Sequence, residues 1–540
     1  MNAHRERSFF LPRRGKQMQE QDNTFSADLS RRGVLMGAAA GGLVIAGGGA
    51  MLAPSANAAK AKIKKGGVLR IGVSGGGPTE TQDAHLGGFT ADTARQYQLY
   101  DRLVTRDSNF KLVLELADTF TPNKTGNIWT IRVKKGVKFH NGRELTADDV
   151  IFTINRVLNP ATKAIRAGAL SGVDAAKMKK VDKYTVSVTL KSANVTFDEV
   201  FSNYAMGIVP VGYDPTKPVG TCPFKYKSFT PGVKSVYTKN TAYWRSGEPY
   251  VDSVEIISIG DETARVNALI SGQVDVITDL PNSQVSTVKS NKKLKVINAK
   301  TGAYVPIAMN ALKEPFNNPL VRQAFRLMID REAVVKQAYS GYAQMGNDMI
   351  GRYDEGYNSK LPQRDYDPEK ARALLKKSGV TIPAMELKTQ DDVAGMLTIP
   401  QIFALNAKQA GVTVNVTTPS NFWDGWPGAN TFATDYYINR TYLEGATLVY
   451  CGGDYAKETG WSNPDFEALI AKALKTPNKA LRNEMVADAQ KIEYDDGAYI
   501  VTSFYNKLDA SSAKVDGFGA GHPSGNSLNN FTLRSVGFVA

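Results

Sequence analysis

VKFHNGRELTADDVIFTINRVL, residues 137–158, is the stretch that decides how the rest of the chain is interpreted. It predicts a strand end, then a turn at Asn141-Gly142, because both residues tolerate positive φ. A helix follows, with Thr146 as its N-cap and Asp149 three residues later, an arrangement typical of a capping box. The next apolar residues recur at helical spacing, and Asn159-Pro160 ends the helix.

The composition is that of a soluble protein of two or three domains. The 540 residues are 42% hydrophobic and 22% charged, and the formal net charge is +14. A basic surface attracts nucleic acid or anionic membranes. The sequence has no stripe of Lys and Arg interleaved with aromatic residues, so it argues against nucleic-acid binding.

The N-terminal segment 1–58 is a predicted export signal rather than part of the fold. Ser30-Arg31-Arg32-Gly33-Val34-Leu35 resembles a twin-arginine signal. An uncharged apolar run covers residues 34–53, and Ala56-Asn57-Ala58 is an A-x-A cleavage site. We therefore expect a periplasmic protein, exported by the twin-arginine route with a cleaved signal. An uncleaved anchor is the alternative.

The sequence contains no recognisable catalytic or metal-binding motif. Cys222, Cys451 and four scattered histidines give no zinc framework, and no nucleophile elbow or kinase signature is present. We expect no cofactor, no metal and no enzymatic activity. An extracytoplasmic enzyme on an α/β scaffold is the main rival interpretation. The two cysteines either form a disulfide or stay as free thiols, because their spacing says nothing about proximity.

Apolar patterning predicts strands and helices that alternate along the chain. We expect a helix over Thr93–Leu103, and strands over Trp129–Val133 and Val181–Leu190. Later helices begin at cap-plus-proline pairs, since Pro suits the first helical position. These pairs are Asn318-Pro319, Asp367-Pro368 and Asn463-Pro464. The order of elements indicates α/β lobes.

Several segments resemble family 5 extracellular solute-binding proteins, the peptide, nickel and opine receptors of ABC importers. Residues 137–150 are similar to the family string v-x-F-H-x-G-x-x-x-t-A-x-D-V. PVGTCPF, residues 218–224, is similar to P-V-G-T-G-P-(F/Y), with Cys222 where the family usually has Gly. Together the similar segments span about residues 67–518.

The resemblance implies an α/β protein with the two-lobed periplasmic-binding-protein fold, type II. An extra α+β subdomain, residues 107–205, would sit on the first lobe, which would comprise residues 59–106 and 206–303. The second lobe would comprise residues 304–504, and residues 505–540 would return to the first lobe.

The function that the resemblance implies is solute binding for an ABC importer. The chain, expected to be a monomer, would close its lobes on a di-/oligopeptide or similar small amine-bearing solute. It would then present the solute to permease subunits in the inner membrane. A receptor for an opine, glycoside or chelated metal, and a sensor built on the same fold, are the alternatives.

The aromatic segment, residues 422–461, is the candidate for the ligand cleft. It holds ten aromatic residues, where the chain average of 9% gives about four. Glycines place many of them on loops, where they suit stacking and cation–π contacts, although half could be ordinary core. The candidate contacts here are Trp423, Trp426, Asp435, Arg440, Tyr442, Asp454 and Trp461.

Charged residues would fix the two ends of such a solute. Asp435 or Asp454 could pair with an ammonium group, and Arg440 could hold a carboxylate through its fork. The family's W-x-x-D-y-x-D-P string is absent from the aromatic segment, so the sequence leaves the specificity for an amino terminus open. The family's opening loop adds Asp83 and His85 as candidate ligand contacts.

Overall fold

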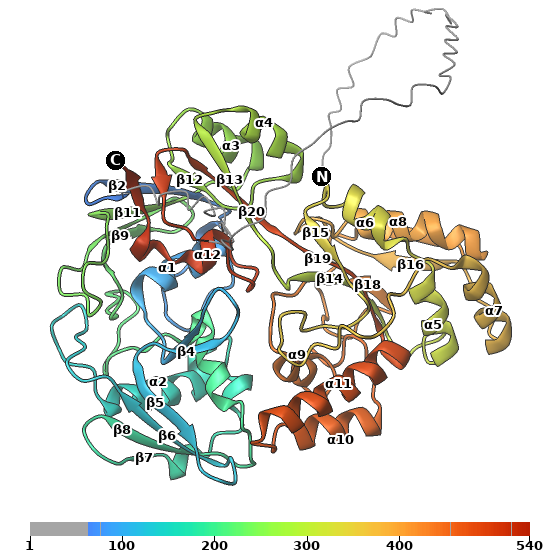
Figure 1. The fold of residues 1–540 in the computed structure, drawn as a ribbon, viewed down its shortest axis with the longest axis horizontal. Helices are drawn as coiled ribbons and strands as arrows, with labels where there is room; N and C mark the ends of the chain where they lie inside the picture. The colour runs from blue at the N-terminus through green and yellow to red at the C-terminus, as the bar shows by residue number, and fades with distance from the viewer. Residues whose placement is uncertain (1–62, 76, 454, 520) are drawn as a thin grey trace, which may run out of the picture. The chain divides into compact units, whose positions relative to one another are not determined.

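The computed structural model describes residues 63–540, apart from positions 76, 454 and 520. The predicted export signal and the candidate contact Asp454 lie outside the described residues. No helix in the described part of the chain is long and apolar enough to cross a membrane. Helices and sheets are mixed, and the described strands form five sheets, the three largest of which organise the fold (Figure 1).

A seven-stranded mixed sheet forms the first centre of the fold. Its strand order is β13-β20-β12-β2-β11-β10-β9. The central strand β2 pairs in parallel with β11 and β12, and the other neighbours are antiparallel. The bounds are β2 Val68–Val73, β9 Phe224–Thr230, β10 Lys234–Lys239, β11 Ser253–Ser258, β12 Val276–Ile277, β13 Leu294–Ala299 and β20 Lys507–Ser512. Helix α3, Glu262–Ile270, connects β11 to β12.

A six-stranded sheet forms the second centre, in the order β15-β19-β14-β18-β16-β17. The bounds are β14 Tyr304–Met309, β15 Ala343–Met345, β16 Met385–Lys388, β17 Val414–Thr417, β18 Phe432–Thr434 and β19 Tyr499–Tyr505. The helices around it are α5 Pro319–Leu327, α6 Arg331–Gln337, α7 Pro368–Ser378, α8 Thr398–Ala407, α9 Tyr442–Val449, α10 Pro464–Ala473 and α11 Lys479–Asp496. The predicted caps Asn318, Asp367 and Asn463 each accept a backbone N–H from the first turn of their helix.

A four-stranded antiparallel sheet with its own core lies between β4 (Leu112–Leu114) and β9 in the sequence. Its order is β5-β6-β8-β7, with β5 Ala117–Pro122, β6 Ile128–Val133, β7 Lys179–Lys180 and β8 Thr185–Thr189. Helix α2, Ala147–Leu158, packs onto it through Val150, Ile154 and Val157. The Asp149 carboxylate accepts the Thr146 N–H at 2.9 Å, which confirms the predicted helix start.

Two chain crossings join the two large sheets. The chain passes from β13 to β14 and returns from β19 to β20. Hydrogen bonds tie the crossings together: Thr301 Oγ1 donates to the Tyr505 carbonyl at 2.6 Å, and Tyr505 N donates to the Ala303 carbonyl at 3.0 Å. A pair of strand connections of this kind is a hinge, because bending them moves one sheet relative to the other.

Two predicted elements differ from the structure for local reasons. The predicted strand Val181–Leu190 is only β8, Thr185–Thr189, because the Asp182 carboxylate accepts the Tyr184 N–H at 2.7 Å and forms a turn. The predicted helix Thr93–Leu103 is α1, Thr90–Leu99.

The end of α1 is set by a residue distant in the sequence. The Leu99 carbonyl accepts the N–H of Cys222 at 3.3 Å, and Gly220 lies so close that a Cβ there would overlap that carbonyl. The chain is therefore extended from Tyr100 onward. Cys222 itself is a buried free thiol, 3.2 Å from Asp101 Oδ1, and Cys451 is also free.

Candidate ligand cavity

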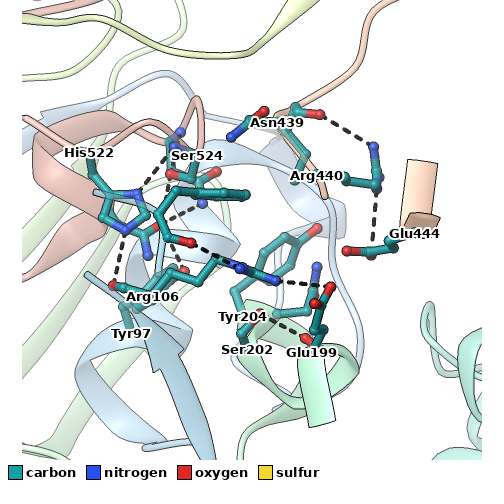
Figure 2. A pocket seen from close by; sticks show the side chains of 15 residues that line it. Tyr97, Arg106, Glu199, Ser202, Tyr204, Asn439, Arg440, Glu444, His522 and Ser524 are labelled. Atoms are coloured by element: carbon teal, nitrogen blue, oxygen red, sulfur yellow. Dashed lines mark hydrogen bonds and ion pairs between the residues drawn. The ribbon is translucent and has the colours of Figure 1, made fainter. Parts of the chain in front are cut away.

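Three adjoining cavities, which we call the Glu199 cavities because Glu199 lines all three, have volumes of about 420, 170 and 50 Å³. Their walls come from the end of β3 (Val104–Arg106), from the 3₁₀ segment Phe197–Ser202, from the start of α9 and from the C-terminal residues 522–530. Figure 2 shows the smallest of the three. Elements connected to both large sheets thus contribute side chains to one place.

Arg106 and Glu199 form the first ion pair of the cavity wall. Arg106 Nη2 lies 3.3 Å from Glu199 Oε2, and its Nη1 donates to the Phe110 carbonyl at 2.9 Å. The guanidinium also lies 4.4 Å from the centre of the Phe110 ring, at cation–π distance. The position of Arg106 is therefore held by three contacts, of which Figure 2 shows the one with Glu199.

Glu199 also contacts the residue that precedes α9. Thr441 Oγ1 donates to Glu199 Oε2 at 2.6 Å, which links the segment before β9 to the second sheet's helices. Burial raises the pKa of Glu199 to about 7, although Arg106 opposes the rise. Its charge therefore changes near neutral pH.

Arg166 and Glu444 form a second ion pair across the same cavities. Arg166 Nη2 lies 2.8 Å from Glu444 Oε1, in the first turn of α9. Burial acts to raise the pKa of Glu444, but Arg166 and Arg440 outweigh it and the net shift is downward. Glu444 is therefore ionised and already has a close cation.

Arg440 and Asn439 are the cavity-lining groups with the weakest protein contacts. Arg440 Nε lies 3.7 Å from Glu444 Oε1, and its Nη1 donates to the Ile438 carbonyl at a long 3.5 Å. Asn439 is 4% exposed, and neither its side-chain amide oxygen nor its side-chain amide nitrogen has a hydrogen-bond partner among the described residues. A Cβ on the crossing residue Gly302 would overlap the Asn439 side chain, so the two are packed tightly.

The remaining wall of the smallest cavity is mostly polar and uncharged. His522 Nδ1 accepts the Ser524 N–H at 3.1 Å, so its Nε2 donates to the Arg106 carbonyl at 3.1 Å. Burial lowers the pKa of His522 to about 4, which keeps the ring neutral. Asn530 accepts a hydrogen bond from Tyr97 at 2.8 Å. It stands in a left-handed turn, residues 528–531, whose φ angles lie between 50° and 61°.

Of the residues predicted from sequence, Arg440 lines the Glu199 cavities, whereas Asp83 and His85 do not. Arg156 donates to Asp83 at 2.5 and 3.0 Å and to His85 Nδ1 at 2.5 Å. His85 Nε2 donates to the Gly207 carbonyl at 2.9 Å, and burial lowers the His85 pKa to about 4. The two side chains are thus occupied by protein partners.

Trp423, Trp426 and Asp435 lie together elsewhere in the aromatic segment. Asp435 is 4% exposed and accepts from Trp426 Nε1 at 3.0 Å and from the Tyr437 hydroxyl at 3.2 Å. Burial raises the pKa of Asp435 and of its neighbour Glu458. Trp423 is 38% exposed, and its Nε1 donates to Asp392 at 3.0 Å.

Tyr442 and Trp461 are buried in the core beside α11. The Tyr442 hydroxyl donates to Glu493 at 2.8 Å, and Trp461 Nε1 donates to Asp496 at 2.9 Å. The Trp461 ring packs edge-on against Tyr450 and Phe466. In this structure both side chains contact protein groups rather than a cavity.

Sequence reasoning did not identify Arg106, Glu199, Ser524 or Asn530 as cavity residues. None of them stands in a recognisable motif, and they meet only through the fold. Arg440 was found because it lies within the aromatic segment. Among the described residues there is no cluster of three or more side chains able to hold a metal ion.

Comparison with known proteins places these features in a family. The model for "Bacterial extracellular solute-binding proteins, family 5 Middle" matches residues 111–446. The glutathione-binding protein GsiB of Pectobacterium atrosepticum is 28% identical over 449 residues, 78% of this chain and 85% of that protein. The protein of the same name from Escherichia coli is 25% identical over 471 residues, 81% and 89% of the two chains.

Solved structures show the same fold at lower identity. AgaA of A. tumefaciens in complex with agropinic acid has a TM-score of 0.75 at 23% identity, covering 88% of this chain and 99% of its own. DppA of Helicobacter pylori in complex with the peptide STSA has a TM-score of 0.74 at 22% identity, with the same coverage. NikZ of Campylobacter jejuni in complex with Ni(L-His) has a TM-score of 0.74 at 18% identity, covering 87% and 99%.

Proposed function

Since the chain belongs to the family 5 bacterial extracellular solute-binding proteins, we propose that it captures a small solute in the Glu199 cavities and delivers it to a membrane permease. The observation that carries the proposal is the composition of the cavity walls. Side chains from elements of both large sheets and from the region of the four-stranded sheet meet there, and two hinge-like crossings connect the large sheets. Movement at the crossings would open and close the cavities around a solute.

Two ion pairs and one hydrogen bond support closure as the mechanism. Arg166 reaches Glu444, and Glu199 holds both Arg106 and Thr441. The Arg166–Glu444 and Glu199–Thr441 contacts each join a residue before β9 to one at the start of α9. The Arg106–Glu199 ion pair joins two residues that both precede β9. A closed arrangement excludes water, which strengthens charge-assisted hydrogen bonds to the solute. No chemical step on the solute is needed, and we propose that the chain is not an enzyme.

The solute class we propose is a di-/oligopeptide or a similar small amine-bearing compound. Relatives are named for glutathione, and the solved relatives hold agropinic acid, a short peptide or a nickel–histidine complex. Arg440 is the sequence-predicted contact that lines the cavities. For Asp83, His85, Trp423, Trp426, Asp435, Tyr442, Asp454 and Trp461, contact with the solute stays a prediction.

We further propose that the chain works in the periplasm as a monomer. Export by the twin-arginine route and cleavage after Ala58 are expectations from the sequence, as are the permease subunits of the inner membrane as partners. Export is tested by the N-terminal sequence of periplasmic protein, before and after Arg31 and Arg32 are both changed to Lys. Retention of the wild-type protein in the cytoplasm would contradict the assignment.

The solute itself is found by thermal-shift screening of the purified protein. The panel contains glutathione, dipeptides, tripeptides, opines, oligosaccharides and nickel–histidine. A solute that binds only the folded state stabilises the protein by mass action and so raises its melting temperature. At one hundred times its Kd, the free energy of unfolding rises by about 2.7 kcal/mol. We expect a shift with peptides or glutathione. The absence of any shift across the panel would count against solute capture in these cavities.

A further inference from the structure

Glu199 lies where the region of the four-stranded sheet meets the helices around the six-stranded sheet. Thr441, the residue before α9, donates to its carboxylate at 2.6 Å. A second contact joins the same two regions, because the Val195 N–H donates to the carbonyl of Leu474, at the end of α10, at 2.8 Å. Opening at the crossings would separate these regions. The surroundings of Glu199 therefore depend on whether the cavities are closed.

The Glu199 carboxylate has few groups that stabilise its charged form. Among the described residues, Thr441 is the one that donates a hydrogen bond to it. Arg106 Nη2 lies 3.3 Å from Oε2 but is buried without a hydrogen-bond partner, so the ion pair lacks a well-directed hydrogen bond (Figure 2). An ionised carboxylate can accept about four hydrogen bonds. The closed arrangement thus leaves the ionised form poorly satisfied and favours the protonated acid.

Other cations in the cavity walls do not make up for this. In the described structure, Arg106 is the one cation within ion-pair distance of Glu199. Arg166 lies 2.8 Å from Glu444 instead. The other cationic side chains of the walls are those of Lys111, Arg440, Lys479 and Arg482. The charge of an ionised Glu199 is therefore balanced by a single guanidinium.

Burial and the neighbouring acids both favour protonation of Glu199. Burial, the largest cause, raises its pKa to about 7, against the opposing effects of Arg106 and Thr441. The nearby carboxylates of Asp198 and Asp354 raise the pKa further. The other carboxyl and imidazole groups of the walls are those of Glu355, Glu444 and His522, and burial keeps the imidazole neutral.

Opening of the cavities would reverse the shift. Once Thr441 and α9 move away, water reaches the Glu199 carboxylate and its pKa falls toward the ordinary value of 4.5. Between about pH 4.5 and pH 7, the closed form therefore holds a proton that the open form lacks. This contribution to closure is full below about pH 4.5 and is lost as the pH rises through 7. A solute acts in the same direction, because it displaces water from the carboxylate.

We propose that capture of a solute in the Glu199 cavities is coupled to the uptake of one proton by the Glu199 carboxylate. The inference rests on the proposed function and adds a regulation of the same site: the affinity for the solute is high in acid and falls toward neutral pH. The Arg166–Glu444 pair does not contribute to this dependence, because Glu444 stays ionised.

Titration calorimetry of the purified protein with glutathione and with trialanine counts the protons. At pH 6 the carboxyl and amino groups of both probes lie well away from their own pKa values. The binding enthalpy is measured in buffers of different ionisation enthalpy, and the slope gives the number of protons taken up. We expect about one proton per solute bound, and an affinity that weakens at least about tenfold between pH 5 and pH 7.

Three variants assign the proton to one carboxylate. Glu199→Gln should reduce the uptake to near zero and make the affinity nearly independent of pH in this range. Glu369→Gln, on the exposed surface of α7, is the matched control and should keep the full uptake. Asp198→Asn tests the neighbouring acid. Uptake that vanishes in Asp198→Asn but persists in Glu199→Gln would overturn the assignment to Glu199.

A further variant keeps the proposal testable if Glu199→Gln folds poorly. Thr441→Val removes, at nearly constant volume, the hydroxyl that donates to the ionised form of Glu199. The pH dependence of the affinity should therefore shift to higher pH. Weakening of the affinity by the same factor at every pH would show that the contact is only structural, and would overturn the inference.

The outcomes separate the inference from the proposed function. Binding of either probe without proton uptake would overturn the coupling and leave solute capture intact. Binding of neither probe, nor of any compound from the wider panel, would overturn both.

Discussion

Arg440 belongs both to the aromatic segment 422–461 and to the wall of the Glu199 cavities. The side chains of the two regions nevertheless differ in how well their hydrogen-bonding groups are satisfied. The aromatic rings are largely satisfied by protein: Tyr437, Tyr442, Tyr450 and Trp461 are buried and donate hydrogen bonds to buried or half-buried acids or stack on one another. In the Glu199 cavities, Asn439 and Arg440 have donors with no strong acceptor. From this difference we expect the aromatic rings to contribute mainly to packing, and the polar atoms without strong partners to contribute mainly to solute binding.

The largest expected effect is on the aromatic side of this comparison. Trp461 is 3% exposed and packs against Tyr450 and Phe466, so Trp461→Ala should lower the free energy of unfolding by about 3–5 kcal/mol. Urea denaturation measures the change. Solute affinity of the remaining folded protein should stay within about twofold. Unchanged stability together with lost affinity would instead make Trp461 a ligand contact.

A pH-dependent effect should follow from Glu493, which accepts hydrogen bonds from Tyr442 and Tyr450 at 2.8 Å each. Burial raises its pKa to about 7, against the opposing effect of Arg326. The folded state thus favours the protonated acid, and this contribution to stability is full below about pH 4.5 and is lost as the pH rises through 7.

Comparison of wild type with Glu493→Gln isolates that contribution. Relative to the wild type, the free energy of unfolding of the variant should rise by about 3 kcal/mol between pH 4.5 and pH 8. Urea denaturation at each pH measures this difference. Glu484→Gln, on the exposed face of the same helix, should show no such trend. A difference that is constant with pH would mean that Glu493 titrates normally.

The third effect tests the cavity side. Glu444→Gln removes the carboxylate shared by Arg166 and Arg440, and we expect a loss of about 1–3 kcal/mol of stability because Arg166 keeps its charge without a partner. A carboxylic acid solute should recover part of this loss, since it brings a new anion. Glu369→Gln, on the surface of α7, is the control. Equal loss with and without solute would show that the pair lies apart from the binding site.

The smallest effect should come from Trp423. Its side chain is 38% exposed and donates to Asp392, so Trp423→Ala should cost less than about 1 kcal/mol of stability. We expect the affinity measured by calorimetry to be unchanged. A tenfold loss of affinity would place the aromatic segment at the binding surface, as the sequence predicts.

Local signals in the sequence were sufficient for most of the secondary structure. The caps at Asn318, Asp367 and Asn463 and the start of α2 depend on residues within one helical turn, and all four are confirmed. The family and its two-lobed fold were also recognisable, because the similar strings are specific in combination.

Features that depend on distant contacts could not be predicted. The helix α1 ends at Leu99 because of a close approach by Gly220, more than one hundred residues later. The cavities bring Arg106, Glu199, Arg440 and Ser524 together, and no spacing in the sequence encodes that meeting. In the part of the chain that the structure describes, both side-chain amide atoms of Asn439 are buried without a hydrogen-bond partner, which is visible only in three dimensions.

The packing of Gly302 against Asn439 has a consequence for how this protein can diverge. One residue belongs to a crossing between the sheets and the other to the cavity wall, and a Cβ on Gly302 would overlap the Asn439 side chain. The two positions should therefore covary among relatives: any residue larger than glycine at 302 requires a smaller one at 439. A substitution of Asn439 that alters solute preference would therefore tend to occur together with a substitution of Gly302 in the hinge.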